Sequence, residues 1–275
     1  RAAAERDPSS AVTRKARVWF QSNDTFRQFM HICIYKQRIL PIDLQFTYVY
    51  VAAHRHRMDG DVTYPERSMK QSSKIWDRFA KGYAKRPISD QASYERKLQV
   101  TQGYLRSDME LLEFGCGTGS TALIHAPHVK HILGIDFSAK MIEFAQAKVD
   151  AASVKNVTVK QSSIEELDQP EQSVDAVLGM SILHLLEEKE DALNKVYRLL
   201  KPGGVFITST VCIGDTMKFF KFILPIGYFL RLIPLVKVFT AKELEESLTQ
   251  AGFAIDHKWR PGKGKAIFIV AKKPA

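Results

Sequence analysis

The chain has 275 residues, of which 45% are hydrophobic, and its 40 basic and 30 acidic side chains give a formal net charge of +10. This length suits one large domain or one domain with an appendage, and the apolar content is sufficient for a sizeable core. The basic residues are scattered and form no recognisable nucleic-acid module, so we expect no nucleic-acid partner, although weak attraction to an anionic membrane surface fits the charge.

The three cysteines, Cys33, Cys116 and Cys212, form an odd and sparse set. This favours a reducing compartment over a disulfide framework, and because no Cys/His cluster has zinc-site spacing we expect no metal. No apolar run reaches the roughly 18 residues of a membrane span, and the N-terminus lacks the pattern of a signal peptide. We therefore predict a cytoplasmic protein.

Residues 1–68 differ in pattern from the rest of the chain. They show no alternation of strand and helix signals, whereas Met69 opens a stretch that resembles a natural start. One interpretation is an N-terminal extension that the native protein lacks. The other is an accessory helical segment, because QFMHICIYKQRIL has an amphipathic pattern. We expect the functional domain to be 69–275.

From about residue 70 onward the sequence predicts regular elements. Two helices come first, at 72–84 and 90–105, separated near Pro87. Ser138 is expected to be a helix N-cap, and the run Lys201-Pro202-Gly203-Gly204 is expected to end the helix that precedes it. The remaining elements, in chain order, are strand 109–114, helix 120–126, strand 131–136, helix 138–152, strand 157–161, strand 174–179, helix 187–200, strand 205–211, helix 241–251, strand 253–259 and strand 265–271.

Short apolar strands that alternate with helices are typical of βαβ units in a mostly parallel sheet. The last two strands are joined by a short turn, so they should be antiparallel to each other. The sequence therefore predicts an α/β fold. We expect a Rossmann-like, doubly wound, mostly parallel seven-stranded sheet with an antiparallel last strand and helices on both faces.

The stretch LLEFGCGTGS at 111–120 places three glycines directly after a strand and before a helix. Glycine lets the backbone turn tightly and approach a ligand closely, and the helix that follows presents free N–H groups. Dinucleotide-binding proteins use G-x-G-x-x-G at this point, but here the third glycine is Gly119 and position 120 is serine. The spacing therefore disfavours a nicotinamide cofactor.

Glu113 followed by Gly115, Gly117 and Gly119 resembles the first motif of the class I S-adenosylmethionine (SAM)-dependent methyltransferases. Four further stretches resemble later motifs of that family in the same order: GIDFS at 134–138, SVDAV at 173–177, ILHL at 182–185 and LKPGG at 200–204. The chain is most similar to the branch that includes the ubiquinone and menaquinone biosynthesis methyltransferases. The segment WDRFA at 76–80 resembles the N-terminal helix of that branch.

The resemblance implies SAM as the cofactor and assigns residues to its site. The glycine loop, which includes Cys116, is expected to pass under the methionine and ribose, and Glu113 either orders the loop or meets the amino group. Asp136 is expected to accept both ribose hydroxyls, a contact that suits a carboxylate. Phe137 and Met141 are assigned to the same site.

The adenine end of the expected site departs from the family pattern. An acid often faces the adenine amino group, but alignment on Glu165-Glu166-Leu167 places Ser163 there, with Ile164 on the purine face. Met180 is expected near the cofactor, or else in loop packing. Tyr83 is the candidate neighbour of the cofactor carboxylate or sulfonium, or else a core aromatic.

Methyl transfer from a sulfonium is an in-line displacement, so alignment of the reactants can supply much of the acceleration. A base is needed only where the acceptor must lose a proton. His184 follows the fourth strand, close to the expected reaction centre, and is the candidate catalytic base. The alternative is a hydrogen-bonded histidine with a structural role.

The insert 215–239 is apolar, carries scattered lysine and arginine, and is broken by Pro225 and Pro234. Three interpretations are open: a lid over a lipophilic acceptor, a helix pair packed on the core, or a surface that makes peripheral contact with a bilayer. We favour the lid, and therefore expect a small acceptor that is apolar or derived from lipid.

Two other functions compete with methyl transfer. An NAD(P)-dependent oxidoreductase is disfavoured by the glycine spacing and by the lack of a Tyr-x-x-x-Lys-type pair in the second half. A SAM-binding module without turnover would keep the same binding motifs, so only an assay separates it from an enzyme.

Overall fold

The centre of the molecule is a seven-stranded β-sheet, counted over the residues that the structure describes. The computed structural model describes residues 64–217, 220, 224, 228 and 234–275, and side chains from Ser72 onward. All of these residues lie within one unit of the chain, Tyr48–Ala275. The strand order in the sheet is β3-β2-β1-β4-β5-β7-β6.

The strands are β1 (Glu110–Phe114), β2 (His131–Asp136), β3 (Val157–Gln161), β4 (Val174–Met180), β5 (Leu200–Thr210), β6 (Ala254–Trp259) and β7 (Ile267–Lys272). Pairing is parallel from β3 through β5, whereas β7 runs antiparallel to both of its neighbours, β5 and β6. This confirms the predicted fold class, including the antiparallel last strand.

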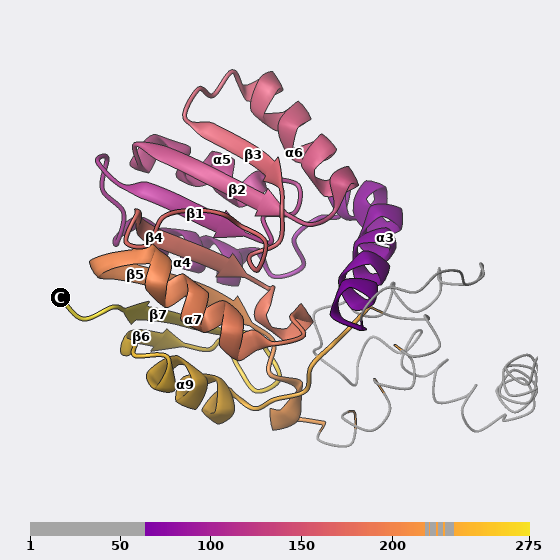
Figure 1. The fold of residues 1–275 in the computed structure, drawn as a ribbon, viewed down its shortest axis with the longest axis vertical. Helices are drawn as coiled ribbons and strands as arrows, with labels where there is room; N and C mark the ends of the chain where they lie inside the picture. The colour runs from indigo at the N-terminus through magenta and orange to yellow at the C-terminus, as the bar shows by residue number, and fades with distance from the viewer. Residues whose placement is uncertain (1–63, 218–219, 221–223, 225–227, 229–233) are drawn as a thin grey trace, which may run out of the picture. The chain divides into compact units, whose positions relative to one another are not determined.

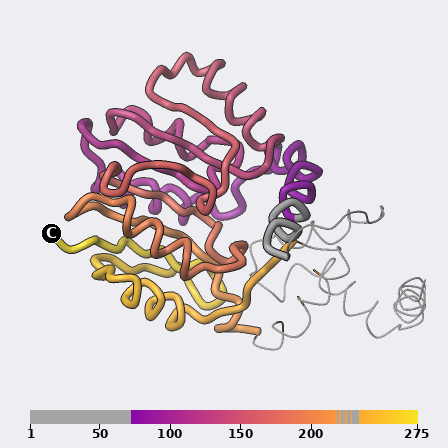
Figure 2. Tube along the Cα trace, in the orientation of Figure 1, coloured from indigo at the N-terminus to yellow at the C-terminus, as the bar shows by residue number. Residues whose placement is uncertain are grey.

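The order of the strands reverses direction in the middle of the sheet. The chain enters at β1, moves outward to β2 and β3, and then returns to β4 on the other side of β1 (Figure 2). Because crossover connections are right-handed, this reversal places the connecting helices on opposite faces of the sheet. The loops after β1 and β4 diverge at the carboxyl edge, which is where open α/β sheets bind their ligands.

Each face of the sheet is covered by its own hydrophobic cluster. Helices α7 (Lys189–Leu199) and α9 (Ala241–Gln250) cover the face that carries Phe206, which is the near face in Figure 1. Helices α4 (Gln91–Gln102), α5 (Ser120–His125) and α6 (Ala139–Ala152) contribute to the cluster on the face that carries Ile207. Since neighbouring strand residues point to opposite faces, β5 serves both clusters.

Helix α7 ends at Leu199, so the predicted end of this helix before 201–204 is confirmed, whereas β5 begins at Leu200 and not at the predicted residue 205. Leu200 pairs with Val174, and the register shifts before the next paired residues, Ala176 and Val205. Residues 201–204 stand opposite the single residue Asp175 of β4, so the pairing is irregular at this end of β5. Gly203 lies in this stretch with a φ of 75°, a conformation that glycine adopts readily.

Helix α3 spans Tyr64–Ala84 and so begins before the predicted start at residue 72. The expected boundary between residues 68 and 69 therefore falls inside a helix. Residues 1–63 and most of the segment 218–233 lie outside the described residues, so the interpretations of the extension and of the insert stay predictions. Within the described part of the chain, no helix is long and apolar enough to cross a bilayer.

Ile207 and Ile124 form a matched pair for testing how closely the core is packed. Ile207 is fully buried in β5, whereas Ile124 on α5 is 37% exposed. Ile207→Val should lower the free energy of unfolding by about 1 kcal/mol, because it removes a buried methyl group and leaves a cavity. Ile124→Val should lower it by less than about 0.5 kcal/mol. Urea unfolding measures both, and equal losses would contradict close packing at Ile207.

Candidate functional site

Three loops meet where β1, β2 and β4 end. The first is the glycine loop between β1 and α5, the second joins β2 to α6, and the third follows β4 and contains the short 3-10 helix η2 (Leu183–Leu185). Helix α3 stands at the same edge, beyond the arrowheads of β1 and β2 (Figure 1). The structure therefore brings together the motifs that the sequence spreads over more than a hundred residues.

The glycine loop adopts a backbone that only glycine fits well. Gly115, Gly117 and Gly119 have φ values of 64°, 54° and 72°, in the left-handed region. A Cβ added to Gly115 would lie 2.7 Å from Cγ1 of Ile182, and one added to Gly119 would lie 3.0 Å from Cβ of Ala145. Both positions thus exclude a side chain by conformation and by space.

The Asp136 carboxylate at the end of β2 is held by two backbone donors. Gly117 N donates to Oδ2 over 3.0 Å, and Ser138 N donates to Oδ1 over 2.9 Å. Burial raises the pKa of Asp136 to about 6, these two donors oppose the rise, and the nearby Asp77 charge adds to it. Because each carboxylate oxygen has a second lone pair, Asp136 can still accept two hydrogen bonds from a ligand.

The Glu113 carboxylate lies in the same region and is 2% exposed. Its Oε2 has no hydrogen-bond partner among the described residues. Burial raises the pKa of Glu113 to about 8, the Asp136 charge raises it further, and a hydrogen bond from the backbone of Ala122 opposes both. A buried acid with an unsatisfied oxygen favours a ligand that brings a positive charge or a hydrogen-bond donor.

Tyr94 of α4 belongs to this site but was not singled out from the sequence. Its hydroxyl forms a hydrogen bond with Thr121 of α5. Burial raises the pKa of Tyr94, the Thr121 bond lowers it, and the Glu113 charge raises it. No sequence signal could have found this residue, because the contact depends on how α4 and α5 pack.

Two of the predicted cofactor residues are packed inside the protein. Cys116 is buried, and its Sγ lies 3.3 Å from where a Cβ of Gly134 would be, so the thiol faces β2. Burial raises the thiol pKa well above its ordinary value, which makes Cys116 unreactive. Met141 is 2% exposed in the first turn of α6, where its N–H is capped by Ser138. The cap at Ser138 was predicted.

The residues predicted for the adenine end are spread between the surface and the core. Ser163 is half-buried, and its Oγ accepts a hydrogen bond of 3.2 Å from Glu166 N, which caps a turn. Ile164 is buried in the core cluster that contains Phe206. Phe137 and Met180 are half-buried at the carboxyl edge. Their contact with a cofactor stays a prediction.

His184 lies in η2 and is almost fully buried. Burial lowers the pKa of its imidazole to about 4. Its backbone carbonyl accepts a hydrogen bond of 2.8 Å from Lys237 N, which ties the loop after β4 to the segment that precedes α9. An imidazole with this pKa is neutral at pH 7 and a weak base, and the role of His184 stays a prediction.

Helix α3 contacts the site through Tyr83 and Asp77. The Tyr83 ring lies 3.6 Å from where a Cβ of Gly117 would be, and it packs edge-on against Trp76. Asp77 accepts a hydrogen bond of 2.6 Å from Ser138 Oγ. The segment WDRFA was noticed in the sequence, but this bond across 61 residues could not be read from it.

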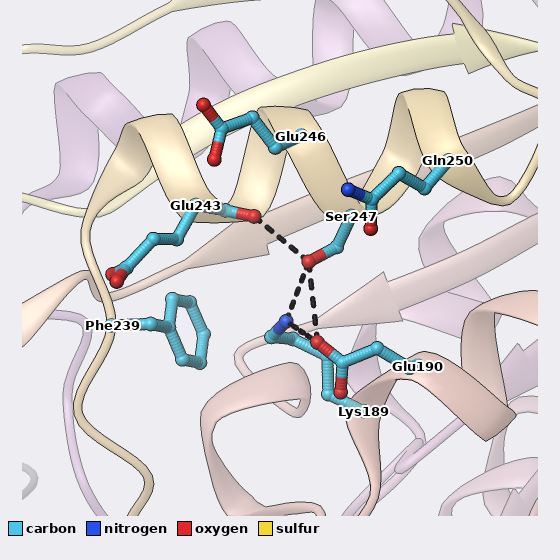
Figure 3. Close-up of a pocket in the computed structure, with 7 residues that line it drawn as sticks. All are labelled: Lys189, Glu190, Phe239, Glu243, Glu246, Ser247 and Gln250. Carbon is cyan, nitrogen blue, oxygen red and sulfur yellow. Dashed lines mark hydrogen bonds and ion pairs between the residues drawn. The ribbon is translucent and has the colours of Figure 1, made fainter.

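A pocket of about 300 Å³ lies away from the glycine loop, between α7 and α9. Figure 3 shows Lys189 reaching from α7 toward Ser247 on α9, with Nζ and Oγ 2.7 Å apart. The ammonium also pairs with Glu190 and lies 5.2 Å from the centre of the Phe239 ring. These contacts join the two helices, and we assign this pocket no ligand.

Residues 105–257 match the family model described as a methyltransferase domain, which is more than half of the chain. The fold and site define the SAM-dependent methyltransferase class, and the chain belongs to this family. A SAM-dependent methyltransferase from Aquifex aeolicus has a similar fold, with a TM-score of 0.52 and 20% sequence identity over 64% of this chain and 89% of that one.

Two relatives are named for quinone biosynthesis. The chain is 27% identical to a demethylmenaquinone methyltransferase of Symbiobacterium thermophilum, over 65% of this chain and 73% of the relative. It is 27% identical to a ubiquinone biosynthesis O-methyltransferase of Rickettsia conorii, over 63% of this chain and 60% of the relative. The family match also overturns the alternative of an NAD(P)-dependent oxidoreductase.

The residues at the carboxyl edge fit the cofactor of this family, which is SAM. The unsatisfied Oε2 of Glu113 suits the ammonium group, and the remaining lone pairs of Asp136 suit two hydroxyls. The glycine loop, with its three left-handed residues, lies at the same edge of the sheet as both acids.

Glu113→Gln should remove a pH-dependent loss of stability. Between the ordinary pKa of 4.5 and the raised value of about 8, the folded protein binds more protons at Glu113 than the unfolded chain does. Stability therefore falls as pH rises through this range, and the variant should be more stable than the wild type by about 4 kcal/mol at pH 8 and by less than about 1 kcal/mol near pH 5.

Urea unfolding at pH 5, 6.5 and 8 without ligand measures this gain. Glu110→Gln is the matched control, because that carboxylate is half-exposed at the other end of β1 and pairs with Lys130. The gain should be absent from the control. A gain for Glu113→Gln that is as large near pH 5 as at pH 8 would contradict the explanation.

Proposed function

We propose that this methyltransferase transfers the methyl group of SAM to a small, lipophilic acceptor of the quinol class. The observation that carries the proposal is the similarity, over 188 residues, to a protein named demethylmenaquinone methyltransferase. The apolar composition of the insert 215–239 supports an acceptor of this kind.

In this proposal the two buried acids hold opposite ends of the cofactor. Asp136 accepts the ribose hydroxyls with the lone pairs that Gly117 N and Ser138 N leave free. Glu113 accepts from the ammonium group, and the glycine loop gives the backbone a close approach to the ligand. When bound, SAM supplies an electrophilic methyl group on a sulfonium.

The rate then depends on alignment of the acceptor with that methyl group rather than on a strong base in the protein. A quinol hydroxyl that reaches the site already ionised can attack the methyl group through its oxygen and needs no further base. This agrees with the low pKa of the buried His184, which makes a poor proton acceptor at neutral pH.

The insert 215–239 is proposed as the acceptor-covering element. Its two ends are joined at the carboxyl edge, where Gly214 N donates to Phe239 O over 3.0 Å. A Cβ at Gly214 would lie 2.8 Å from the backbone of Phe239, so glycine permits this close approach. Lys237 N donates to His184 O and connects the second end to the loop after β4. We further propose a cytoplasmic location with peripheral membrane contact through this insert, since the acceptor class is lipophilic.

Incubation of the full chain with isotopically labelled SAM and an extract of quinols and lipids tests the acceptor class. Mass spectrometry should find an apolar product that has gained one labelled methyl group. Asp136→Asn should abolish this gain at low SAM concentration and weaken affinity for S-adenosylhomocysteine by about 100-fold, because the charged acceptor of two hydroxyls is lost.

Asp175→Asn is the matched control in the same sheet. Asp175 lies at the opposite end of β4, where it accepts hydrogen bonds from Glu110 N and from Lys201 Nζ. Asp175→Asn should therefore leave the affinity for S-adenosylhomocysteine unchanged. Absence of nucleoside binding by the wild type would refute the proposed site. Binding without any methylated product would instead favour a binding module that lacks turnover.

The pH profile of the reaction tests the role of His184. Because the imidazole pKa is about 4, His184 should not titrate between pH 6 and 8. The pH profiles of the maximal rate for the wild type and for His184→Gln, measured on one acceptor, should therefore have the same shape in that range. The variant should retain the maximal rate within about threefold if it folds. An inflection near pH 6.5 that His184→Gln removes would restore the catalytic-base interpretation.

A further inference from the structure

Asp77, in the middle of α3, caps a helix that is not its own. Its Oδ1 accepts hydrogen bonds from Ser138 Oγ over 2.6 Å and from Lys140 N over 3.1 Å, both at the N-terminus of α6. Ser138 Oγ also accepts from Met141 N over 3.2 Å. One hydroxyl serves both contacts, because it has a proton to donate and lone pairs to accept with.

This position suits a carboxylate for two physical reasons. The first N–H groups of a helix have no partner within the helix, and Lys140 N is one of them. The helix dipole also makes the N-terminus of α6 favourable for negative charge. Asp77 thus attaches α3 to α6 by charge-assisted hydrogen bonds, which are stronger than bonds between neutral groups.

Helix α3 lies close to both residues whose N–H groups donate to Asp136, namely Ser138 and Gly117. Ser138, which donates its hydroxyl to Asp77, donates its N–H to Asp136 Oδ1. Gly117, which donates to Asp136 Oδ2, lies near Tyr83, less than two turns further along α3, because a Cβ on Gly117 would lie 3.6 Å from the Tyr83 ring. Helix α3 therefore contacts the α6 side and the glycine-loop side of one carboxylate.

The placement of Asp77 has an electrostatic cost. Its charge adds to the rise in the pKa of Asp136, after the larger effect of burial. A second acid near a buried carboxylate does not improve that carboxylate as an acceptor. Asp77 therefore contributes by positioning Ser138 and the first turn of α6.

We propose that Asp77 is a positioning residue that fastens α3 to the N-terminus of α6 and thereby holds Asp136 and the glycine loop in the arrangement that binds the cofactor. Asp77 acts through Ser138 and need not touch the ligand. The inference rests on the proposed role of Asp136. If the fastened state is the one that binds, the apparent dissociation constant rises in inverse proportion to its population.

Two substitutions separate the hydrogen bonds of Asp77 from its charge. Asp77→Ala removes both bonds and should weaken the affinity of the full chain for S-adenosylhomocysteine about tenfold, mainly through faster dissociation. Asp77→Asn keeps an acceptor oxygen in the same place and should recover affinity to within about threefold of the wild type. Glu143→Ala is the control, because that exposed carboxylate of α6 pairs with the side chain of Lys140 alone.

Hydrogen exchange of the unliganded protein gives an independent readout. In Asp77→Ala, backbone amides of 72–84 and of the first turn of α6 should exchange about tenfold faster, whereas those of β1 and β4 should not change. The maximal methyl-transfer rate at saturating SAM should stay within about threefold of the wild type while the KM for SAM rises. This pattern separates positioning from a general loss of stability, which would speed exchange in the strands as well.

Two results would overturn the inference. Unchanged exchange in α3 would show that Asp77 does not fasten the helix. Faster exchange in α3 with unchanged affinity would show that fastening does not position Asp136. If the wild type itself fails to bind S-adenosylhomocysteine, the proposed cofactor role of Asp136 fails, and with it the positioning role, whatever the exchange data show about the helix.

Discussion

The Asp136 carboxylate is held away from water at the end of β2 by one N–H from the glycine loop and one from the first turn of α6. Much of the local sequence is needed to make this possible. The loop must turn through left-handed conformations to aim Gly117 N at the carboxylate, which explains three alternating glycines. The helix must begin at Ser138, whose side chain caps α6 while its N–H serves Asp136. Strand β2 must end at Asp136, so that the carboxylate lies between these two donors.

Two acids buried side by side are unfavourable for the fold itself. Burial raises the pKa of both Glu113 and Asp136, and the Asp136 charge adds to the rise at Glu113. The two buried acids therefore carry an electrostatic cost, which a ligand with a cationic group and hydroxyl donors can reduce. Such conflicts between stability and local structure are expected where a protein binds its ligand.

The sequence was most informative where the signal is local. Glycine spacing, apolar strand runs and the Ser138 cap each depend on a few neighbouring residues, and they placed Gly115, Gly119 and Asp136 correctly at the ends of β1 and β2. Proline and glycine at 202–204 correctly predicted the end of the preceding helix, because their local preference is for turns. The earlier start of β5, where Leu200 pairs with Val174, depends on a partner strand and could not be read from these residues.

Contacts between distant elements were out of reach of the same reasoning. Tyr94 meets Thr121 through helix packing, and Asp77 meets Ser138 across two elements. Ile164 is buried in the core cluster that contains Phe206, and its expected contact with the purine stays a prediction.

Strand β7, at 267–272, lies between β5 and β6 although it comes later in the chain than either. A nascent chain leaving the ribosome can assemble β1 to β5 first, but one side of β5 stays unpaired until β7 has been synthesised. Phe268 and Val270, both fully buried, also belong to β7 and complete the cluster around Ile207. The interior of the sheet is thus completed by a strand that is synthesised late, and until then the unpaired edge of β5 can pair with another chain.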